Sequence, residues 1–336
     1  MKKLAIFIGI TLISAGGFIM LKENNSTVTI GLGGDTMIGR LTNAVIAQHG
    51  CAYIWGNLLP VMQATDFNFV NLETTLTKSN EFVPKTFNFK SDPQHATCLK
   101  FANIHAVNIA NNHMLDFSVD GLLETVESLK NNKIKHVGAG KNLEAASAPI
   151  IIEKNGIKIG FIGYADYPDE WAAIEDEPGI NYIRIGDIKR IKEDIDALKK
   201  RCNIVVISMH WGPNMRTHPT PEFINFAHNI IDAGADIFHG HSAHIFQGIE
   251  QYKNKLIFYD MGELVDDYAV DQDLRNDCSF FTIVTIDKKG IKSFKLIPIF
   301  INQMQVNKAI DQNYEWIVER IKKLSAEFNT NVEMLF

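Results

Sequence analysis

The stretch Val28-Thr29-Ile30-Gly31-Leu32-Gly33-Gly34-Asp35 is the segment from which the fold can be worked out. Its apolar residues Val28, Ile30 and Leu32 alternate with smaller or polar residues, which is the period-two pattern of a β-strand. The strand runs into two glycines and then an acid. Asp35 is therefore predicted to lie where the first strand ends.

An apolar strand followed by a polar cluster recurs farther along the chain. The predicted strands cover residues 67–70, 106–110, 204–207 and 237–238, and the residues after them include Glu73, Asn112 with His113, His210, and His241 with His244. In open α/β sheets, ligands bind beyond the carboxyl ends of the strands, so these side chains are expected to converge on one edge.

The segments between and after these strands show helix and hairpin patterns. Helices are predicted around residues 122–129, from Asp187 to Leu198 and from Thr220 to Gly234, a hairpin at Asn155-Gly156, four strands within residues 248–299, and a last helix with Ile310, Tyr314, Ile317, Ile321 and Leu324 on one stripe. Strands alternating with helices, followed by hairpins, predict an α/β sandwich with a mixed sheet in one domain.

Composition and charge narrow the class of protein. With 336 residues, 46% of them hydrophobic and 21% charged, the chain can bury a substantial core. Its net charge of -6 is spread along the sequence without a basic stripe. Nucleic acid is therefore excluded as a partner, since phosphate contact requires such a stripe.

The N-terminal residues carry a targeting signal. Lys2 and Lys3 precede an uncharged run over residues 4–21, which as a helix would span about 27 Å, close to the thickness of the hydrocarbon layer. Residues 1–26 are predicted to form a membrane anchor and linker; a cleaved signal peptide is the alternative, although Ser14-Ala15-Gly16 imitates its cleavage site poorly. The basic flank places the rest of the chain outside the cell membrane, or in the periplasm or medium after cleavage.

The four cysteines, Cys51, Cys98, Cys202 and Cys278, are widely spaced and contain no CxxC pair. This spacing excludes a zinc ribbon and a thioredoxin-type motif. One or two disulfides and small buried hydrophobic side chains both stay open as explanations.

The donor types at the strand ends predict a metal centre. Each has an ordinary explanation by itself: Asp35 as a turn acid, Glu73 as a solvated loop acid, His210 as a hydrogen-bonded histidine. Together they offer carboxylate, amide and imidazole ligands, which suit Mn, Fe or Zn better than calcium or a structural zinc.

Five separated motifs resemble a known family, the CapA proteins of poly-γ-glutamate capsule synthesis, which are similar to calcineurin-like metallophosphoesterases. The motifs are Gly34-Asp35-Thr36-Met37-Ile38-Gly39-Arg40, Asn71-Leu72-Glu73, Ala110-Asn111-Asn112-His113, His210-Trp211-Gly212-Pro213-Asn214-Met215 and Gly240-His241-Ser242-Ala243-His244. The resemblance runs from about Thr29 to Ile301. It implies a metallophosphoesterase-like α/β/β/α sandwich with mixed sheets over residues 27–301, with the amphipathic helix of residues 302–336 packed on it.

The resemblance also implies roles for individual residues. Two divalent ions would be held by Asp35, Glu73, Asn112, His210, His241 and His244, with Asp35 on the first ion and Glu73 bridging both. His113 would be the catalytic residue, as the acid or charge stabiliser at the leaving group. Such ions lower the pKa of a bound water. The sequence departs from the phosphoesterase pattern at Met37, where a ligand histidine is usual, and at Glu73, where the bridging residue is usually aspartate.

Other residues are candidates for substrate binding, namely Arg40, Trp211 and Asn214. Arg40 could instead form an ion pair and Trp211 could simply pack in the core. Asp260, Asp266, Asp267 and Arg275 form a polar run, either near the site or in a solvated loop.

Three functions are compatible with the sequence. The first is a metal-dependent hydrolase acting on a phosphate ester in the cell envelope, and His113 favours it. The second is a non-catalytic accessory protein for assembly, export or retention of an anionic polymer such as poly-γ-glutamate, in a capsule-synthesis complex of the membrane. The third, a purely structural envelope protein, leaves the five motifs unexplained.

Overall fold

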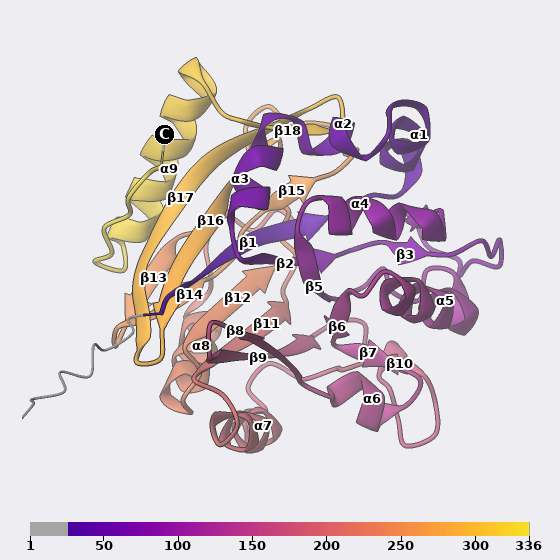
Figure 1. The fold of residues 1–336 in the computed structure, drawn as a ribbon, viewed down its shortest axis with the longest axis horizontal. Helices are drawn as coiled ribbons and strands as arrows, with labels where there is room; N and C mark the ends of the chain where they lie inside the picture. Colours follow the sequence, from indigo (N-terminus) through magenta and orange to yellow (C-terminus); the bar gives the residue numbers. More distant parts are fainter. Residues whose placement is uncertain (1–25, 336) are drawn as a thin grey trace, which may run out of the picture.

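Two mixed β-sheets pack face to face in the centre of the molecule, and helices cover their outer faces (Figure 1). The structure is a computed structural model that describes residues 26–335. The core between the sheets contains Val28, Ile30 and Leu32 from one sheet and Ile204 and Val206 from the other. The α/β/β/α sandwich expected from the sequence is confirmed.

The first sheet has the strand order β18-β17-β16-β1-β2-β5-β6, and β15 also pairs with β1. β1, β2, β5, β6 and β15 run parallel to one another, whereas β16 pairs with β1 in the antiparallel sense, and β16, β17 and β18 follow one another as antiparallel hairpins. The bounds are β1 Val28–Thr36, β2 Phe67–Leu72, β5 Ile104–Asn108, β6 Lys135–Val137, β15 Glu263–Val265, β16 Cys278–Asp287, β17 Gly290–Asn302 and β18 Gln305–Lys308.

The second sheet has the order β13-β14-β12-β11-β9-β8, with a parallel centre and antiparallel edges. The bounds are β8 Ile150–Lys154, β9 Ile157–Ala165, β11 Ile204–His210, β12 Ile237–His241, β13 Ile249–Tyr252 and β14 Lys255–Phe258. Two short pairs lie outside the sheets: β3 Thr75–Leu76 with β4 Lys90–Ser91, and β7 Ala139–Gly140 with β10 Gly179–Ile180.

The central strands are apolar on both faces because both faces are covered. In β11, Ile204 and Val206 face the other sheet, while Val205 and Ile207 join the cluster that includes helix residues. Parallel strands buried in this way have nearly continuous apolar sequences. The helices are α1 Arg40–His49, α2 Cys51–Trp55, α3 Leu59–Ala64, α4 Ala96–Phe101, α5 Ser118–Asn131, α6 Leu143–Ser147, α7 Lys189–Lys199, α8 Pro221–Asp232 and α9 Asp311–Ala326, with 3₁₀ turns at Gly56–Leu58, Pro93–His95 and Asp169–Trp171. Of these, α9 packs against the core between the sheets.

The predicted helices α5, α7 and α8 are present, and Thr220 caps α8 by accepting a hydrogen bond from the Phe223 amide. The predicted stripe of α9 holds for Ile317, Ile321 and Leu324, which are buried. For Ile310 the prediction is wrong: it precedes the helix as its N-cap and is 69% exposed.

A disulfide between Cys51 and Cys98 joins α2 to α4. Cys202 and Cys278 are free thiols, and Cys278 is buried. Within residues 26–335, no helix has the length and apolar character needed to cross a bilayer. The predicted anchor or signal segment lies outside the described residues.

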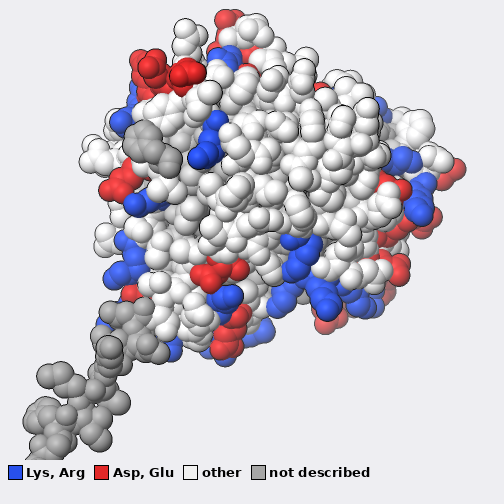
Figure 2. All heavy atoms as spheres, turned by 45° about the horizontal axis from the view of Figure 1, so that its top comes forward, with Lys and Arg blue, Asp and Glu red and all other residues white. Residues whose placement is uncertain are grey.

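The face drawn in Figure 2 carries basic and acidic side chains in mixed groups around a broad area with few charges. Several basic side chains gather along its lower right edge, with acidic side chains beside them.

Candidate metal centre

Asp35 is the carboxylate around which the candidate ligands gather. It is completely buried near the end of β1, where Asn71 Nδ2 donates to its Oδ1 at 2.8 Å and the Ser242 amide donates to its Oδ2 at 3.2 Å. Its Oδ1 lies 3.5 Å from His241 Nδ1, and its Oδ2 lies 3.3 Å from His244 Nδ1. The two oxygens of one side chain thus face two different histidines.

The first ligand group consists of Asp35, His210 and His241, whose ligand-type atoms lie within 4.8 Å of one another. His210 and His241 are the last residues of β11 and β12, neighbouring parallel strands in which these two positions are directly paired. Their Nδ1 atoms are 3.1 Å apart. The strand register therefore places both imidazoles against Asp35.

A second group shares Asp35 and adds His244 and Glu263, again with ligand-type atoms within 4.8 Å. Glu263 Oε1 lies 2.7 Å from His244 Nδ1. Glu263 is absent from the residues selected from the sequence. The sequence does contain a signal for it, because Gly262-Glu263 comes after an apolar run, as Gly34-Asp35 comes after the apolar residues of β1.

The donor set fits divalent metal ions. Several buried ligand-type atoms have no hydrogen-bond partner within the described part of the chain: Glu73 Oε1, Asn112 Oδ1, His244 Nδ1, and Glu263 Oε1 and Oε2. Leaving such an atom unpaired costs roughly 1–3 kcal/mol, and more for a charged group. A divalent cation would give these unpaired atoms a partner, because carboxylate, amide and imidazole groups are all metal ligands.

The protonation of His210 and His241 also suits ligation. Burial lowers the pKa of His210 to about 3 and lowers the pKa of His241 well below its usual range, so both rings are neutral at pH 7. Metal-binding histidines must be neutral. His244 differs, because burial lowers its pKa but the Glu263 and Asp35 carboxylates raise it above the ordinary value, so this ring would release its proton on binding an ion. Burial alone would raise the pKa of Asp35, but the neighbouring histidines, chiefly His244, hold it below the ordinary value.

Glu73 lies beside the two groups without belonging to either. It follows β2 directly, is fully buried, and accepts a hydrogen bond from Asn71 Nδ2 at 3.1 Å on Oε2. Its oxygens stand 3.8 Å from His210 Nδ1 and 3.8 Å from His113 Nε2. The carboxylate shared by both groups is Asp35, which differs from the bridging role that the resemblance implied for Glu73. Burial, followed by the charge of Asp35, raises the pKa of Glu73.

His113 is oriented by a buried carboxylate. Its Nδ1 lies 2.7 Å from Asp116 Oδ2, and Lys85 Nζ lies 2.8 Å from Asp116 Oδ1. Lys85 also donates to the Asn112 carbonyl at 2.6 Å, which fixes the loop that carries His113. Burial lowers the pKa of His113, and Asp116 acts in the opposite direction. With Nδ1 engaged, Nε2 is the nitrogen that faces Glu73.

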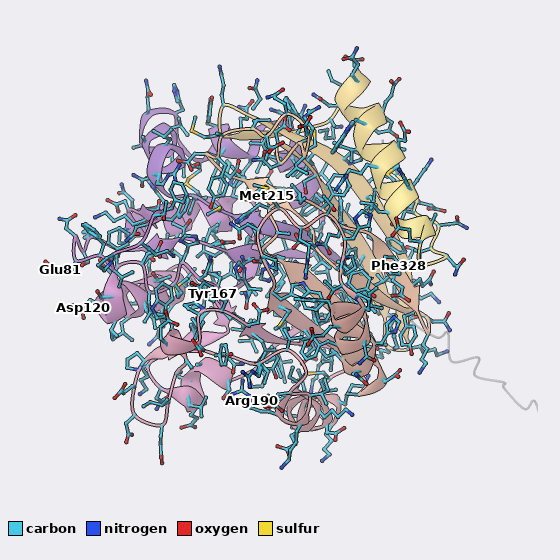
Figure 3. All side chains as sticks on the ribbon, turned by 180° about the vertical axis from the view of Figure 1, so that it is seen from behind. Glu81, Asp120, Tyr167, Arg190, Met215 and Phe328 are labelled. Carbon is cyan, nitrogen blue, oxygen red and sulfur yellow. A yellow bond between two sulfur atoms is a disulfide. The ribbon has the colours of Figure 1, made fainter. Side chains whose placement is uncertain are left out.

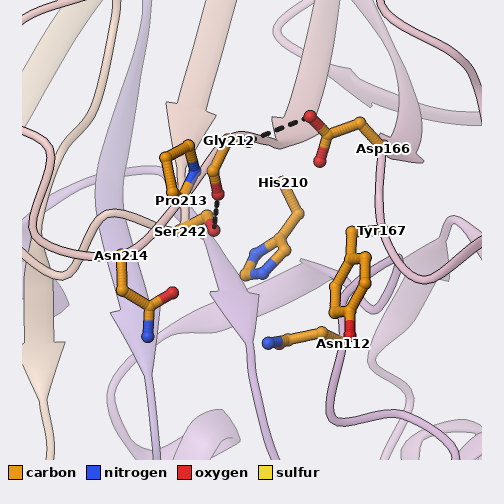
Figure 4. A pocket seen from close by; sticks show the side chains of 8 residues that line it. All are labelled: Asn112, Asp166, Tyr167, His210, Gly212, Pro213, Asn214 and Ser242. Atoms are coloured by element: carbon orange, nitrogen blue, oxygen red, sulfur yellow. Dashed lines mark hydrogen bonds between the residues drawn. The ribbon is translucent and has the colours of Figure 1, made fainter.

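An open cleft reaches the first ligand group at His210 (Figure 4). One part, of about 520 Å³, is lined by Asn112, Asp166, Tyr167, His210, Gly212, Pro213, Asn214 and Ser242. In the close-up, His210 points into the space between Asn112, Asn214 and Tyr167. The loops after β9 and β11, marked by Tyr167 and Met215 in Figure 3, form this wall. Burial raises the pKa of Asp166 to about 6.

A second part of the cleft, of about 440 Å³, adjoins the first, because both are lined by Asn112, Tyr167 and Asn214. Lys85 and His113 line this second part. The structure thus brings together every predicted ligand, the predicted acid and Asn214.

Two of the three candidate substrate-binding residues lie elsewhere. The prediction that Trp211 binds substrate is wrong. Trp211 is completely buried among Phe223, Phe238 and Tyr259, and its Nε1 donates to the Tyr259 carbonyl at 2.9 Å. Its side chain therefore has no access to a substrate. Arg40 pairs with Asp267 at 3.1 Å and stacks on an aromatic ring, which is the ion-pair alternative.

The polar run after β14 is not a solvated loop. Asp260 is fully buried and accepts from the Ala243 amide at 2.8 Å and from the Gly262 amide at 2.9 Å, so it supports the loop of His244 and the start of β15. Asp266 is also buried, whereas Arg275 pairs with Asp277 at 2.8 Å away from the ligands. Met37 is buried and belongs to neither ligand group.

Comparison with known proteins agrees with these findings. Residues 29–268 match the family described as bacterial capsule synthesis protein PGA_cap. A probable polyglutamine synthesis accessory protein of Mycobacterium tuberculosis (strain CDC 1551 / Oshkosh) is 30% identical, with 92% of this chain and 94% of the relative aligned. The PGA biosynthesis protein CapA of Bacillus subtilis (strain 168) is 31% identical over 80% of this chain and 70% of that protein.

Among solved structures, a hypothetical protein from Thermus thermophilus shares the fold with a TM-score of 0.50 and 14% identity, over 80% of this chain and 98% of that chain. The family match covers the five strand-end motifs from Asp35 to His244 and extends past Glu263. This chain belongs to the PGA_cap family of bacterial capsule synthesis proteins.

Proposed function

We propose that this chain is a metal-dependent hydrolase of the cell envelope that acts on a phosphate ester or a related bond during synthesis of an anionic capsule polymer such as poly-γ-glutamate. The observation that carries the proposal is the placement of an oriented His113 beside buried ligand groups that open into a cleft. The names of the Bacillus and Mycobacterium relatives support the link to polyglutamate synthesis.

The side chains divide the chemistry among themselves. Asp35, His210, His241, His244 and Glu263 would hold divalent ions, with Glu73 and Asn112 at their margin. Such ions supply Lewis-acid activation of water and charge neutralisation at the phosphoryl oxygens. His113 would give the proton on Nε2 to the leaving oxygen, while Asp116 holds Nδ1 and stabilises the ring's charged form. Asn112 and Asn214 would orient the substrate from the wall of the cleft.

An accessory role without catalysis is the second candidate. Met37 stands where the phosphoesterase pattern has a ligand, and the mycobacterial relative is named an accessory protein. In that role the metal centre would bind the carboxylates of the polymer. The residues that line the cleft include one lysine, Lys85. Cationic side chains alone would therefore attract a polyanion only weakly.

Turnover by the purified full-length chain on a panel of phosphomonoesters and phosphodiesters separates the two candidates. For a hydrolase, His113→Ala should keep its metal and lose turnover by roughly 10² to 10⁴-fold, the usual contribution of a positioned acid. His210→Ala should lose metal and turnover together. His49→Ala, which alters an exposed histidine at the end of α1, is the control.

The accessory role predicts a different pattern. The wild-type chain would turn over none of the substrates, and His113→Ala would bind polymer as the wild type does. If His113→Ala lost as much metal as His210→Ala, His113 would be a ligand, and both candidates would fail in their present form.

The location outside the cell membrane is part of the proposal. It is supported by the basic flank before the apolar run of residues 4–21 and by the Cys51–Cys98 disulfide, since such bonds persist in oxidising compartments. A membrane complex for capsule synthesis is the partner that this location favours.

A further inference from the structure

Glu263 is held next to Asp35 by the backbone itself. β15 pairs with β1 in parallel, and within this ladder Glu263 is the direct partner of Asp35. Directly paired residues of neighbouring strands project from the same face of a sheet. The pairing that brings two buried carboxylates together is therefore built into the sheet and does not depend on a flexible loop.

Two glycines allow this approach. The Asp35 amide donates to the Gly262 carbonyl at 2.9 Å, and a Cβ added to Gly34 would lie 1.8 Å from that same oxygen. Gly262 has a φ of 67°, a conformation that side chains disfavour. The Asp260 carboxylate accepts hydrogen bonds from the Gly262 amide and from the Ala243 amide, which is next to His244 in the chain.

Hydrogen bonds do not explain the burial of Glu263. It is 0% exposed, and neither of its oxygens has a hydrogen-bond partner within residues 26–335. His244 Nδ1 lies 2.7 Å from Glu263 Oε1, yet the same nitrogen also lacks a well-directed hydrogen bond. His244 Nδ1 and Glu263 Oε1 are thus close together but not in hydrogen-bond geometry. Ligand atoms around a shared metal ion have this arrangement.

We propose that Glu263 is a metal ligand and that Asp35, His244 and Glu263 form an ion position of their own, next to the one formed by Asp35, His210 and His241. Each position has its own oxygen of Asp35, since Oδ1 faces His241 and Oδ2 faces His244. The inference rests on the metal centre of the proposed function, but it does not require that the chain hydrolyse a substrate.

The two positions differ in chemistry. Asp35, His210 and His241 offer two imidazoles and one carboxylate, a set that suits zinc. Asp35, His244 and Glu263 offer two carboxylates and one imidazole, and oxygen-rich sets favour manganese. Glu263 is thereby the residue that sets the metal preference of the second position.

Metal content of the full-length chain in detergent tests the proposal. The protein is stripped with a chelator, equilibrated with Mn²⁺ and Zn²⁺ together, and analysed for both elements. The wild type should hold two ions per chain; Glu263→Gln should hold one and lose most of its manganese; His210→Ala should lose zinc. Glu250→Gln, the same change at a buried acid that already bonds Tyr259 and His228, should hold two.

Thermal unfolding separates ligation from a structural role. Without metal, the melting temperature of Glu263→Gln is the baseline of the test, because the substitution also removes the negative charge that lies 2.7 Å from His244 Nδ1. On adding Mn²⁺, its melting temperature should rise less than that of the wild type. A lowered melting temperature of the metal-free variant with an unchanged Mn²⁺ response would make Glu263 structural and overturn the proposal.

Two further results bear on it. Two ions in Glu263→Gln, or a single ion in the wild type, would overturn the second position. If the wild-type chain holds two ions but turns over no substrate, the result supports the second ion position and contradicts the proposal that the chain is a hydrolase.

Discussion

At the scale of single residues, the direction of the side chain decides which candidates serve the site and which serve the core. His210 and Trp211 are neighbours in sequence, and both are buried. His210 ends β11 with its ring toward the ligands, whereas Trp211 turns into the cluster that packs under α8. A candidate metal ligand and a core-packing residue therefore lie one position apart.

Trp211→Ala should cost about 3–5 kcal/mol of unfolding free energy, the range for truncating a buried aromatic side chain. The hydrogen bond from Nε1 to the Tyr259 carbonyl is lost as well. Urea unfolding followed by circular dichroism measures this cost. Tyr167→Ala is the matched control, because Tyr167 is 62% exposed in the cleft wall and its loss should change stability by less than about 0.5 kcal/mol. Equal urea midpoints for the two variants would contradict the assignment.

At the scale of elements, the site is built where parallel strands end together. The ends of β11 and β12 are in register, so that His210 and His241 stand side by side, and β2 and β15 flank β1 around Asp35.

The helices α1 to α4 were not predicted from the sequence. Several of them are one or two turns long, and such short segments show too little periodicity to be recognised.

The disulfide is the element-scale device that joins α2 to α4. It closes a sequence separation of 47 residues, for which chain entropy gives about 4 kcal/mol of stabilisation, with about 2–4 kcal/mol usually measured. The double variant Cys51→Ala with Cys98→Ala should lose that amount in urea unfolding and keep its metal content, since neither cysteine lies in a ligand group. Cys202→Ala, at a free thiol, should unfold like the wild type. If the double variant were as stable as the wild type, the disulfide would not contribute to the stability of the fold.

At the scale of the whole molecule, the sandwich is predicted to lie outside the cell membrane. Lys2 and Lys3 precede the apolar run, and such a basic flank stays on the cytoplasmic side of the membrane. A reporter fused after Phe336 that is active only outside the cytoplasm should be active. As a control, the same fusion lacking residues 1–25 should be silent. Activity of a reporter that works only in the cytoplasm would reverse the topology.

The sequence by itself determined the sandwich and most of the ligand set. Strand periodicity and the polar residues after each strand are local signals, so Asp35, His210, His241 and His244 could be found without coordinates. The family resemblance then ordered the motifs, and the match over residues 29–268 agrees with it.

Only the tertiary structure decided which carboxylate the ligand groups share and that Glu263 joins them. Glu263 lies 228 positions after Asp35 in the chain, yet the two are paired residues of neighbouring strands. The same holds for Asp116 behind His113, Asp267 against Arg40 and the disulfide partners. The physical reason is that sequence patterns report local periodicity and burial, whereas strand register and the pairing of side chains depend on which distant segments pack together.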